Sequence, residues 1–225
     1  MFPSFVVRRL LELYPDDPIV GIPSNTGTER FAELGHQYKR IAAILGDAFY
    51  HATRLDDARS YTKFATGDSK TYVYHFNTRG FVNSTNATYT DTVGGFAPAY
   101  KGVAHASELA FVFNNPHFYG PWAGYKELSD IMSALWINFA YDGNPNGAFN
   151  GTYVINGATD TVPQTLSIVN VTGQQRPFWP SYGEDSRGLN LVLQTQGQGG
   201  IYVEPDTYRL EGREYLASWA RRRHV

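Results

Sequence analysis

The clearest hydrophobic pattern in the chain lies at residues 128–140, where apolar side chains recur at the spacing of one helical stripe. Asp142 and Gly143 follow it, and glycine adopts the left-handed conformation that commonly ends a helix. The spacing therefore predicts a helix that buries one face and stops at Gly143. Residues 205–221 predict a terminal helix. The expected buried residues are Leu128, Ile131, Met132, Leu135, Trp136, Phe139 and Ala140 in the first helix and Tyr208, Tyr215, Leu216 and Trp219 in the second.

The first 65 residues also predict helices. Residues 1–13 predict a short helix that ends before Pro15, because proline disfavours the helical conformation in the residue that precedes it. Thr26 and Glu29 match a capping box and predict a helix start there. Gly46-Asp47 is expected to end that helix and to begin another one that reaches about residue 65. The apolar positions of the capped helix are Phe31, Leu34, Tyr38, Ile41 and Leu45.

Strand-like stretches are few. Residues 71–76 are rich in β-branched and aromatic side chains and predict a strand, and shorter strands are expected near 165–171, 189–194 and 200–203. A parallel strand is normally flanked and covered on both faces, so the neighbours of 71–76 are expected in sequence outside these 225 residues. Helices alternating with few strands predict an α/β layer structure with an incomplete sheet, in a single domain.

Composition excludes several classes of partner. The formal net charge is −2 and charges of both signs are interspersed, which gives no electrostatic footprint for nucleic acid or an acidic membrane. Cysteine is absent, so disulfides and thiolate metal sites are excluded within this sequence. No apolar run approaches the length of a membrane span, and no transmembrane segment is expected. The many aromatic residues suit a large core or a groove for apolar or sugar-like ligands.

Glycosylation motifs and the N-terminus point in different directions. Four Asn-x-Ser/Thr sequons favour a secreted, extracellular glycoprotein, whereas residues 1–13 lack the apolar core and cleavage site of a signal peptide. We therefore expect Met1 to be an internal residue of a longer secreted protein or the start of a truncated gene product. The four acceptors are Asn83, Asn86, Asn150 and Asn170.

Histidines are the candidates for proton transfer. No pair has the spacing of a metal site, so no metal is expected. His105 differs from the other five, because it lies in a loop of small residues between a strand region and an apolar segment, where catalytic side chains tend to sit. Spacing alone still favours an incidental role over catalysis. The others are expected in helices (His36, His51), a strand (His75), an Asn-Pro loop (His117) and the C-terminal end (His224).

Four motifs in order carry a resemblance to a known family. They are Thr71-Tyr72-Val73-Tyr74-His75-Phe76, the run from Gly102 to Phe113 around His105, Trp136 to Asn146 with its Gly-Asn-Pro-Asn turn, and Trp179-Pro180-Ser181-Tyr182. Together they resemble the corresponding segments of type-B carboxylesterases, cholinesterases and related fungal lipases. The resemblance implies that residues 1–225 are the C-terminal part of one α/β-hydrolase domain, with an incomplete central sheet flanked by helices.

The resemblance also implies a role for His105. It would be the general base and acid of a Ser–His–acid triad. Glu108 would be a hydrogen-bonding group that supports this histidine and is not the triad acid; a carboxylate favoured at a helix N-terminus is an equal alternative. Ala106 replaces the glycine common in cholinesterases. In this fold the serine and the acid precede the histidine, but the chain has no Gly-x-Ser-x-Gly elbow, and the nearest sequence, at Ser69, lacks the second glycine.

We therefore expect a fragment of a carboxylic-ester hydrolase, a serine esterase or lipase without cofactor, that is inactive alone. Its parent would act on a small-molecule ester or lipid. Two alternatives remain open at this point. A cholinesterase-like fold also serves as a non-catalytic interaction module, and a carbohydrate-binding domain would present an exposed planar row of Tyr and Trp.

Overall fold

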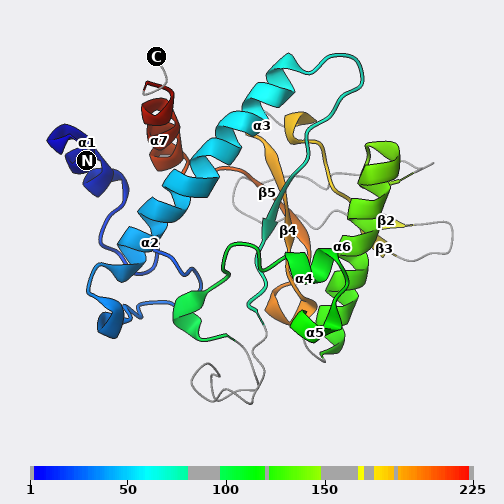
Figure 1. Ribbon diagram of the computed structural model, residues 1–225, viewed down its shortest axis with the longest axis horizontal. Helices are drawn as coiled ribbons and strands as arrows, with labels where there is room; N and C mark the ends of the chain where they lie inside the picture. The colour runs from blue at the N-terminus through cyan, green and yellow to red at the C-terminus, as the bar shows by residue number, and fades with distance from the viewer. Residues whose placement is uncertain are drawn as a thin grey trace. The chain divides into compact units, whose positions relative to one another are not determined.

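The computed structural model describes residues 3–80, 97–119, 122–147, 167–169, 175–184 and 187–222. The chain folds into two compact units (Figure 1). The helical unit comprises residues 1–61, 98–102 and 207–225, and the sheet unit comprises residues 62–97 and 103–206. Each unit has its own buried core. Single turns of 3-10 helix occur at Ala32–Leu34, Ala99–Lys101, Tyr182–Glu184 and Gln196–Gln198.

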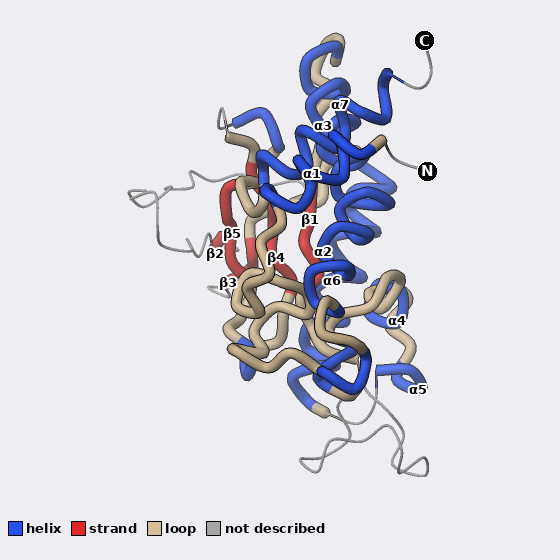
Figure 2. The backbone as a smooth tube through the Cα atoms, turned by 90° about the vertical axis from the view of Figure 1, so that its left-hand side faces the viewer, coloured by secondary structure: helices blue, strands red, loops and turns tan. Residues whose placement is uncertain are grey.

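The sheet unit is built on three strands, β1 (Val73–Phe76), β4 (Leu189–Leu193) and β5 (Tyr202–Pro205). Their order is β1-β4-β5 (Figure 2). β1 is parallel and β5 antiparallel to β4. The strands expected near 71–76, 189–194 and 200–203 are therefore confirmed. Every residue of β4 is buried, as a central strand requires. The expectation that the neighbours of β1 lie outside these 225 residues is wrong for one side, because β4 lies beside it. Within the described residues the other side of β1 is unpaired, so β1 forms an edge of this sheet.

A second, two-stranded sheet pairs β2 (Ser167–Val169) with β3 (Gln175–Pro177) in antiparallel register. The strand near 165–171 is confirmed by β2. The partner strand β3 was not expected, because Gln-Arg-Pro contains no β-branched or aromatic residue and proline is unfavourable within a strand.

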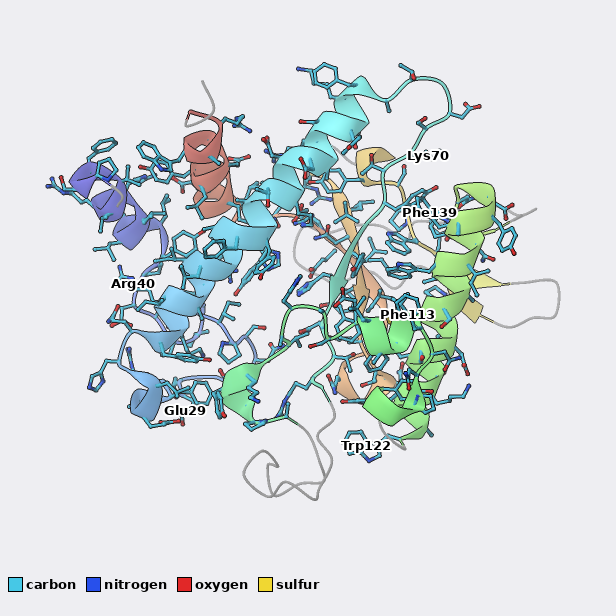
Figure 3. All side chains as sticks on the ribbon, viewed as in Figure 1. Glu29, Arg40, Lys70, Phe113, Trp122 and Phe139 are labelled. Carbon is cyan, nitrogen blue, oxygen red and sulfur yellow. The ribbon has the colours of Figure 1, made fainter. Side chains whose placement is uncertain are left out.

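The long helix α6 (Ala123–Asp142) confirms the prediction from the hydrophobic stripe. Gly143 ends it with φ 65° in the left-handed region. Leu128, Met132 and Leu135 are buried in the core of the sheet unit. Phe139 and Ala140 were also expected to be buried, and this expectation is wrong, because both are exposed, Phe139 to 47%. The Phe139 ring, labelled in Figure 3, contacts Tyr72 edge-on at 5.9 Å. The shorter helices α4 (Leu109–Val112) and α5 (Pro116–Tyr119) precede α6, and α4 packs on it.

The helical unit contains α1 (Ser4–Leu13), α2 (Tyr38–Gly46), most of α3 (Ala52–Phe64) and α7 (Leu210–Arg222). The short first helix and its stop before Pro15 are confirmed, as is the end of α3 near residue 65. The core of this unit consists of Val6, Leu10, Tyr14, Ala43, Ala52, Leu216 and Ala217.

The expected capping box is wrong. The Thr26 hydroxyl donates to the Pro23 carbonyl oxygen at 2.9 Å and accepts from the buried Lys39 ammonium at 2.7 Å, so it is engaged away from any helix N-terminus. The backbone at Phe31 then turns left-handed, with φ 53°, which a helix does not allow. Helix α2 begins only at Tyr38. His36, expected in this helix, lies in the turn before it.

The expected helix break at Gly46-Asp47 is also wrong. Gly46 keeps helical dihedral angles, and a single π-helical turn, Asp47–His51, joins α2 directly to α3. The Ala52 N–H donates to the Asp47 carbonyl oxygen five residues earlier. The Asp47 side chain does not cap a new helix, because it is buried and bonded to Tyr14 and Arg209.

Tyr208 was expected to be buried in the terminal helix, and this expectation is wrong. It is 48% exposed and precedes α7, which begins at Leu210. Arg209 has φ 48° and directs its guanidinium to the Asp47 carboxylate at 2.7 and 2.8 Å. The backbone therefore becomes helical only after this residue. Leu216 is buried as expected, and Tyr215 and Trp219 pack against the same core.

Candidate active site

His105 lies on an exposed turn directly before α4 in the sheet unit. The Ser107 N–H donates to the Ala104 carbonyl oxygen at 3.2 Å and closes the turn around the imidazole. Neighbouring Val103 packs against the core of the unit, which anchors one end of the turn. The structure thus places His105 on a loop held by core packing, with its ring accessible, while its catalytic role stays a prediction.

Ala106 shows why glycine suits the residue after this histidine. Its φ is 67°, in the left-handed region that a side chain with Cβ disfavours by roughly 1–2 kcal/mol. The turn that presents His105 therefore carries local backbone strain.

We expect Ala106→Gly to raise the free energy of unfolding by up to about 1 kcal/mol, because relief of this strain outweighs the added flexibility of the unfolded chain. Ala104→Gly, two residues earlier and without a positive φ, should lower it by about 0.4–1 kcal/mol. Urea unfolding of both variants measures the two effects. If both variants changed the free energy of unfolding in the same direction, the role of the positive φ at Ala106 would be contradicted.

Glu108 begins helix α4 and also contacts the sheet. Its carbonyl oxygen accepts from the N–H groups of Phe111 at 2.9 Å and Val112 at 3.0 Å. Its carboxylate accepts from the Tyr74 hydroxyl at 3.3 Å. The carboxylate thus bonds to Tyr74 and makes no cap bond to the helix that it precedes. Its role as a hydrogen-bonding group near His105 stays a prediction.

Tyr74 contacts the candidate site through Glu108, although the sequence did not single it out. Burial of the ring, together with the nearby Glu108 carboxylate, raises the pKa of Tyr74 to about 12. The hydroxyl is therefore protonated at neutral pH and donates to Glu108. Its only sequence signal is alternation, which puts Tyr72, Tyr74 and Phe76 on the core face of β1.

His75 forms an imidazole–carboxylate pair that was not foreseen. Its Nδ1 lies 3.1 Å from Oε1 of Glu204 on β5. The two residues flank the central strand on the opposite face to Tyr74, and only the strand order brings them together. Their side chains are 42% and 29% exposed. His51 is exposed in the π-helical turn, and the side chains of His117 and His224 lie outside the described residues.

Three other expectations concern glycosylation, metal binding and the membrane. The acceptors Asn83, Asn86, Asn150 and Asn170 lie outside the described residues. Within the described ranges no three His, Asp or Glu side chains are grouped as metal ligands. No helix in the same ranges is long and apolar enough to cross a membrane.

Two tryptophans of the sheet unit are packing residues. Trp136 and Trp179 contact each other with ring centroids 5.1 Å apart, and both pack in the core. They form no exposed planar row, so they lend no support to the carbohydrate-binding alternative.

Comparison with known proteins gives low but consistent similarity to ester hydrolases. Carboxylesterase 4A of Bos taurus is 30% identical over 100 residues, covering 44% of this chain and 14% of the relative. Fatty acyl-CoA hydrolase precursor, medium chain, of Anas platyrhynchos is 26% identical over 135 residues, covering 60% and 20%. Carboxylesterase 5A of Mus musculus is 26% identical over 155 residues, covering 66% and 20%. The chain thus matches between 14% and 20% of the length of these relatives.

The match to the family as a whole is more extensive. The profile of the carboxylesterase family matches residues 25–203, a range that contains β1, the His105 turn, α6 and β4. This range covers most of the chain. The small mixed sheet with its helices is consistent with part of the α/β-hydrolase fold of that family. The chain therefore belongs to the carboxylesterase family.

Proposed function

We propose that this chain supplies the triad histidine of a carboxylic-ester hydrolase. The observation that carries the proposal is the exposed position of His105 on a turn that is linked to the edge strand β1 through Glu108 and Tyr74. The turn also lies inside the range matched by the family. The serine and the acid would come from polypeptide outside these 225 residues, next to the free edge of β1.

The proposed chemistry follows from the two protonation states of imidazole. The neutral His105 ring takes the proton of a seryl hydroxyl as its oxygen attacks the ester carbonyl carbon. The resulting imidazolium gives this proton to the departing alkoxide when the ester C–O bond breaks. Water then replaces the alcohol, and the same two proton transfers release the carboxylic acid. These steps need no metal or organic cofactor.

The proposal extends to substrate class and location. The relatives are carboxylesterases and an acyl-CoA hydrolase, which supports a small-molecule or lipid acyl ester as the substrate. The four sequons support a secreted glycoprotein, with glycans at Asn83, Asn86, Asn150 and Asn170.

The chain alone is expected to hydrolyse no p-nitrophenyl ester above the buffer rate and to take up no fluorophosphonate label. Triad members act as a unit, so a histidine without the nucleophile retains little of the rate. Turnover that disappears in His105→Ala would contradict this expectation.

A complementation assay tests His105 directly. The chain is co-expressed with a carboxylesterase segment that carries a Gly-x-Ser-x-Gly elbow, an acid and an oxyanion loop. We expect ester hydrolysis that falls by at least roughly a thousandfold in His105→Ala but survives in His75→Ala. Restored hydrolysis that is indifferent to His105→Ala would exclude this residue as the general base.

A further inference from the structure

The Tyr74 ring is held in a fixed position by its aromatic neighbours. The Trp136 ring lies edge-on at 5.0 Å between centroids, and the Trp179 ring lies edge-on at 5.9 Å. Trp179 is fixed in turn, because its indole N–H donates to the Val73 carbonyl oxygen at 3.0 Å. The Tyr74 hydroxyl therefore has a well-defined location at the end of a partly buried ring.

Asn146 fixes Trp179 from the other side. Its amide nitrogen donates to the Trp179 carbonyl oxygen at 2.9 Å, and its amide oxygen accepts from the Trp179 N–H at 2.8 Å. These two hydrogen bonds connect the turn after α6 with Trp179, whose ring packs on Tyr74. A chain of direct contacts thus runs from Asn146 through Trp179 to Tyr74 and Glu108.

The His105 turn needs an external support of this kind. Helix α4, which follows it, has four residues and cannot be stable by itself. Ala106 holds an unfavourable φ, which persists only where surrounding contacts over-determine it. Glu108 joins the turn to α4, and its carboxylate is bonded to the fixed Tyr74 hydroxyl.

We propose that Tyr74 is a positioning residue for His105, because its hydroxyl holds Glu108 and so fixes the turn at residues 104–107 against β1. The relevance to ester hydrolysis rests on the function proposed for His105. The effect of Tyr74 on the turn itself can be measured in the 225-residue chain without any substrate.

Tyr72 provides a matched control for Tyr74. It lies two residues earlier on the same face, and its ring also contacts Trp179, at 6.1 Å. Its hydroxyl points to a different partner, the Asn144 side-chain oxygen at 3.5 Å. Tyr72→Phe and Tyr74→Phe therefore remove the same atom from similar surroundings, but only the second removes the bond to Glu108.

Hydrogen exchange at two amides reports on the turn. The Ser107 N–H donates to Ala104 and the Leu109 N–H donates to the Ala106 carbonyl oxygen at 3.3 Å. We expect Tyr74→Phe to accelerate exchange at both amides roughly tenfold relative to Tyr72→Phe, the size expected for a hydrogen bond to a charged group. Amides of α6, measured in the same samples, correct for any change in global stability.

A double-variant cycle with Glu108→Ala, which removes the acceptor of the Tyr74 hydroxyl, separates positioning from general loosening. If Tyr74 acts through Glu108, the two changes are not additive, and the double variant exchanges no faster than the worse single variant. The His105 ring resonances should shift in the same direction in Tyr74→Phe and Glu108→Ala and stay in place in Tyr72→Phe.

Two results would overturn the proposal. One is equal exchange at Ser107 and Leu109 in Tyr72→Phe and Tyr74→Phe, and the other is full additivity in the cycle. If Tyr74→Phe does not fold, Glu108→Ala alone must still release both amides. Because these measurements involve no ester, they can fail while His105-dependent hydrolysis in the complementation assay holds, and the reverse outcome is equally separable.

Discussion

An Asp47→Ala chain is expected to have a free energy of unfolding lower by about 3–5 kcal/mol, as when one partner of a buried ion pair is removed. The Asp47 side chain is fully buried and accepts hydrogen bonds from Tyr14 at 2.8 Å and from Arg209 at 2.7 and 2.8 Å. Alanine would leave the Arg209 guanidinium, 11% exposed, without its counter-charge. Urea unfolding followed by circular dichroism measures the loss.

The Tyr14 phenol is part of the same effect. Burial, and then the Asp47 carboxylate, raise the pKa of Tyr14, so the hydroxyl stays neutral and loses its acceptor in the variant. Asp57→Ala is the control, because Asp57 is exposed on α3, and it should change the free energy of unfolding by less than about 0.5 kcal/mol. Similar losses of unfolding free energy in the two variants would show that the buried pairing of Asp47 with Arg209 stabilises the fold no more than a surface charge does.

Phe111→Ala should lower the free energy of unfolding by about 3–5 kcal/mol, through lost burial and the cavity left behind. The Phe111 ring is 2% exposed and lies 5.1 Å from the Phe76 ring, 5.5 Å from Tyr119 and 5.4 Å from Tyr125. It thus joins α4 and α5 to β1 and α6. Thermal and urea unfolding of the purified variant test the expectation.

Phe113 provides the comparison for Phe111. It follows the last residue of α4, is labelled in Figure 3, and is 76% exposed. Phe113→Ala removes the same ring from the same short segment and should change stability by less than about 0.5 kcal/mol. A loss at Phe113 as large as that at Phe111 would argue against the core described here.

The elements that were predictable from the sequence depend on local signals. The stripe of α6 and its stop at Gly143 need only helical spacing and a left-handed glycine. The end of α1 needs only Pro15. β1 is likewise visible in its composition, because residues 71–76 are rich in aromatic and β-branched side chains.

The missed features depend on contacts between distant residues. Asp47 resembles a helix-breaking residue locally, but its carboxylate binds Arg209 and does not cap a new helix. The chain therefore stays helical from α2 through the π-helical turn at Asp47 into α3. Thr26 has a side chain that can cap a helix, but its hydroxyl instead accepts a hydrogen bond from the Lys39 ammonium. No pattern within either segment reveals its distant partner.

The candidate site also has one part that could be predicted from the sequence and one part that could not. His105 and Glu108 could be predicted because four motifs occur in a family order, whereas their surroundings could not. The Tyr74 contact needs β1 and α4 to be placed together, and the pairing of His75 with Glu204 needs the order β1-β4-β5. Both are properties of the assembled sheet unit.

The separation of Asp47 and Arg209 along the chain has a consequence for biosynthesis. The two residues are 162 positions apart. At roughly 5–20 residues per second, a ribosome needs on the order of ten to thirty seconds to add that stretch. Throughout that interval α1 and the π-helical turn have been made without α7, so the surfaces that they bury against α7 are not yet covered by it. The helical unit described here can close only after α7 has been made, whereas the neighbours β4 and β5 are close in sequence and can pair at once.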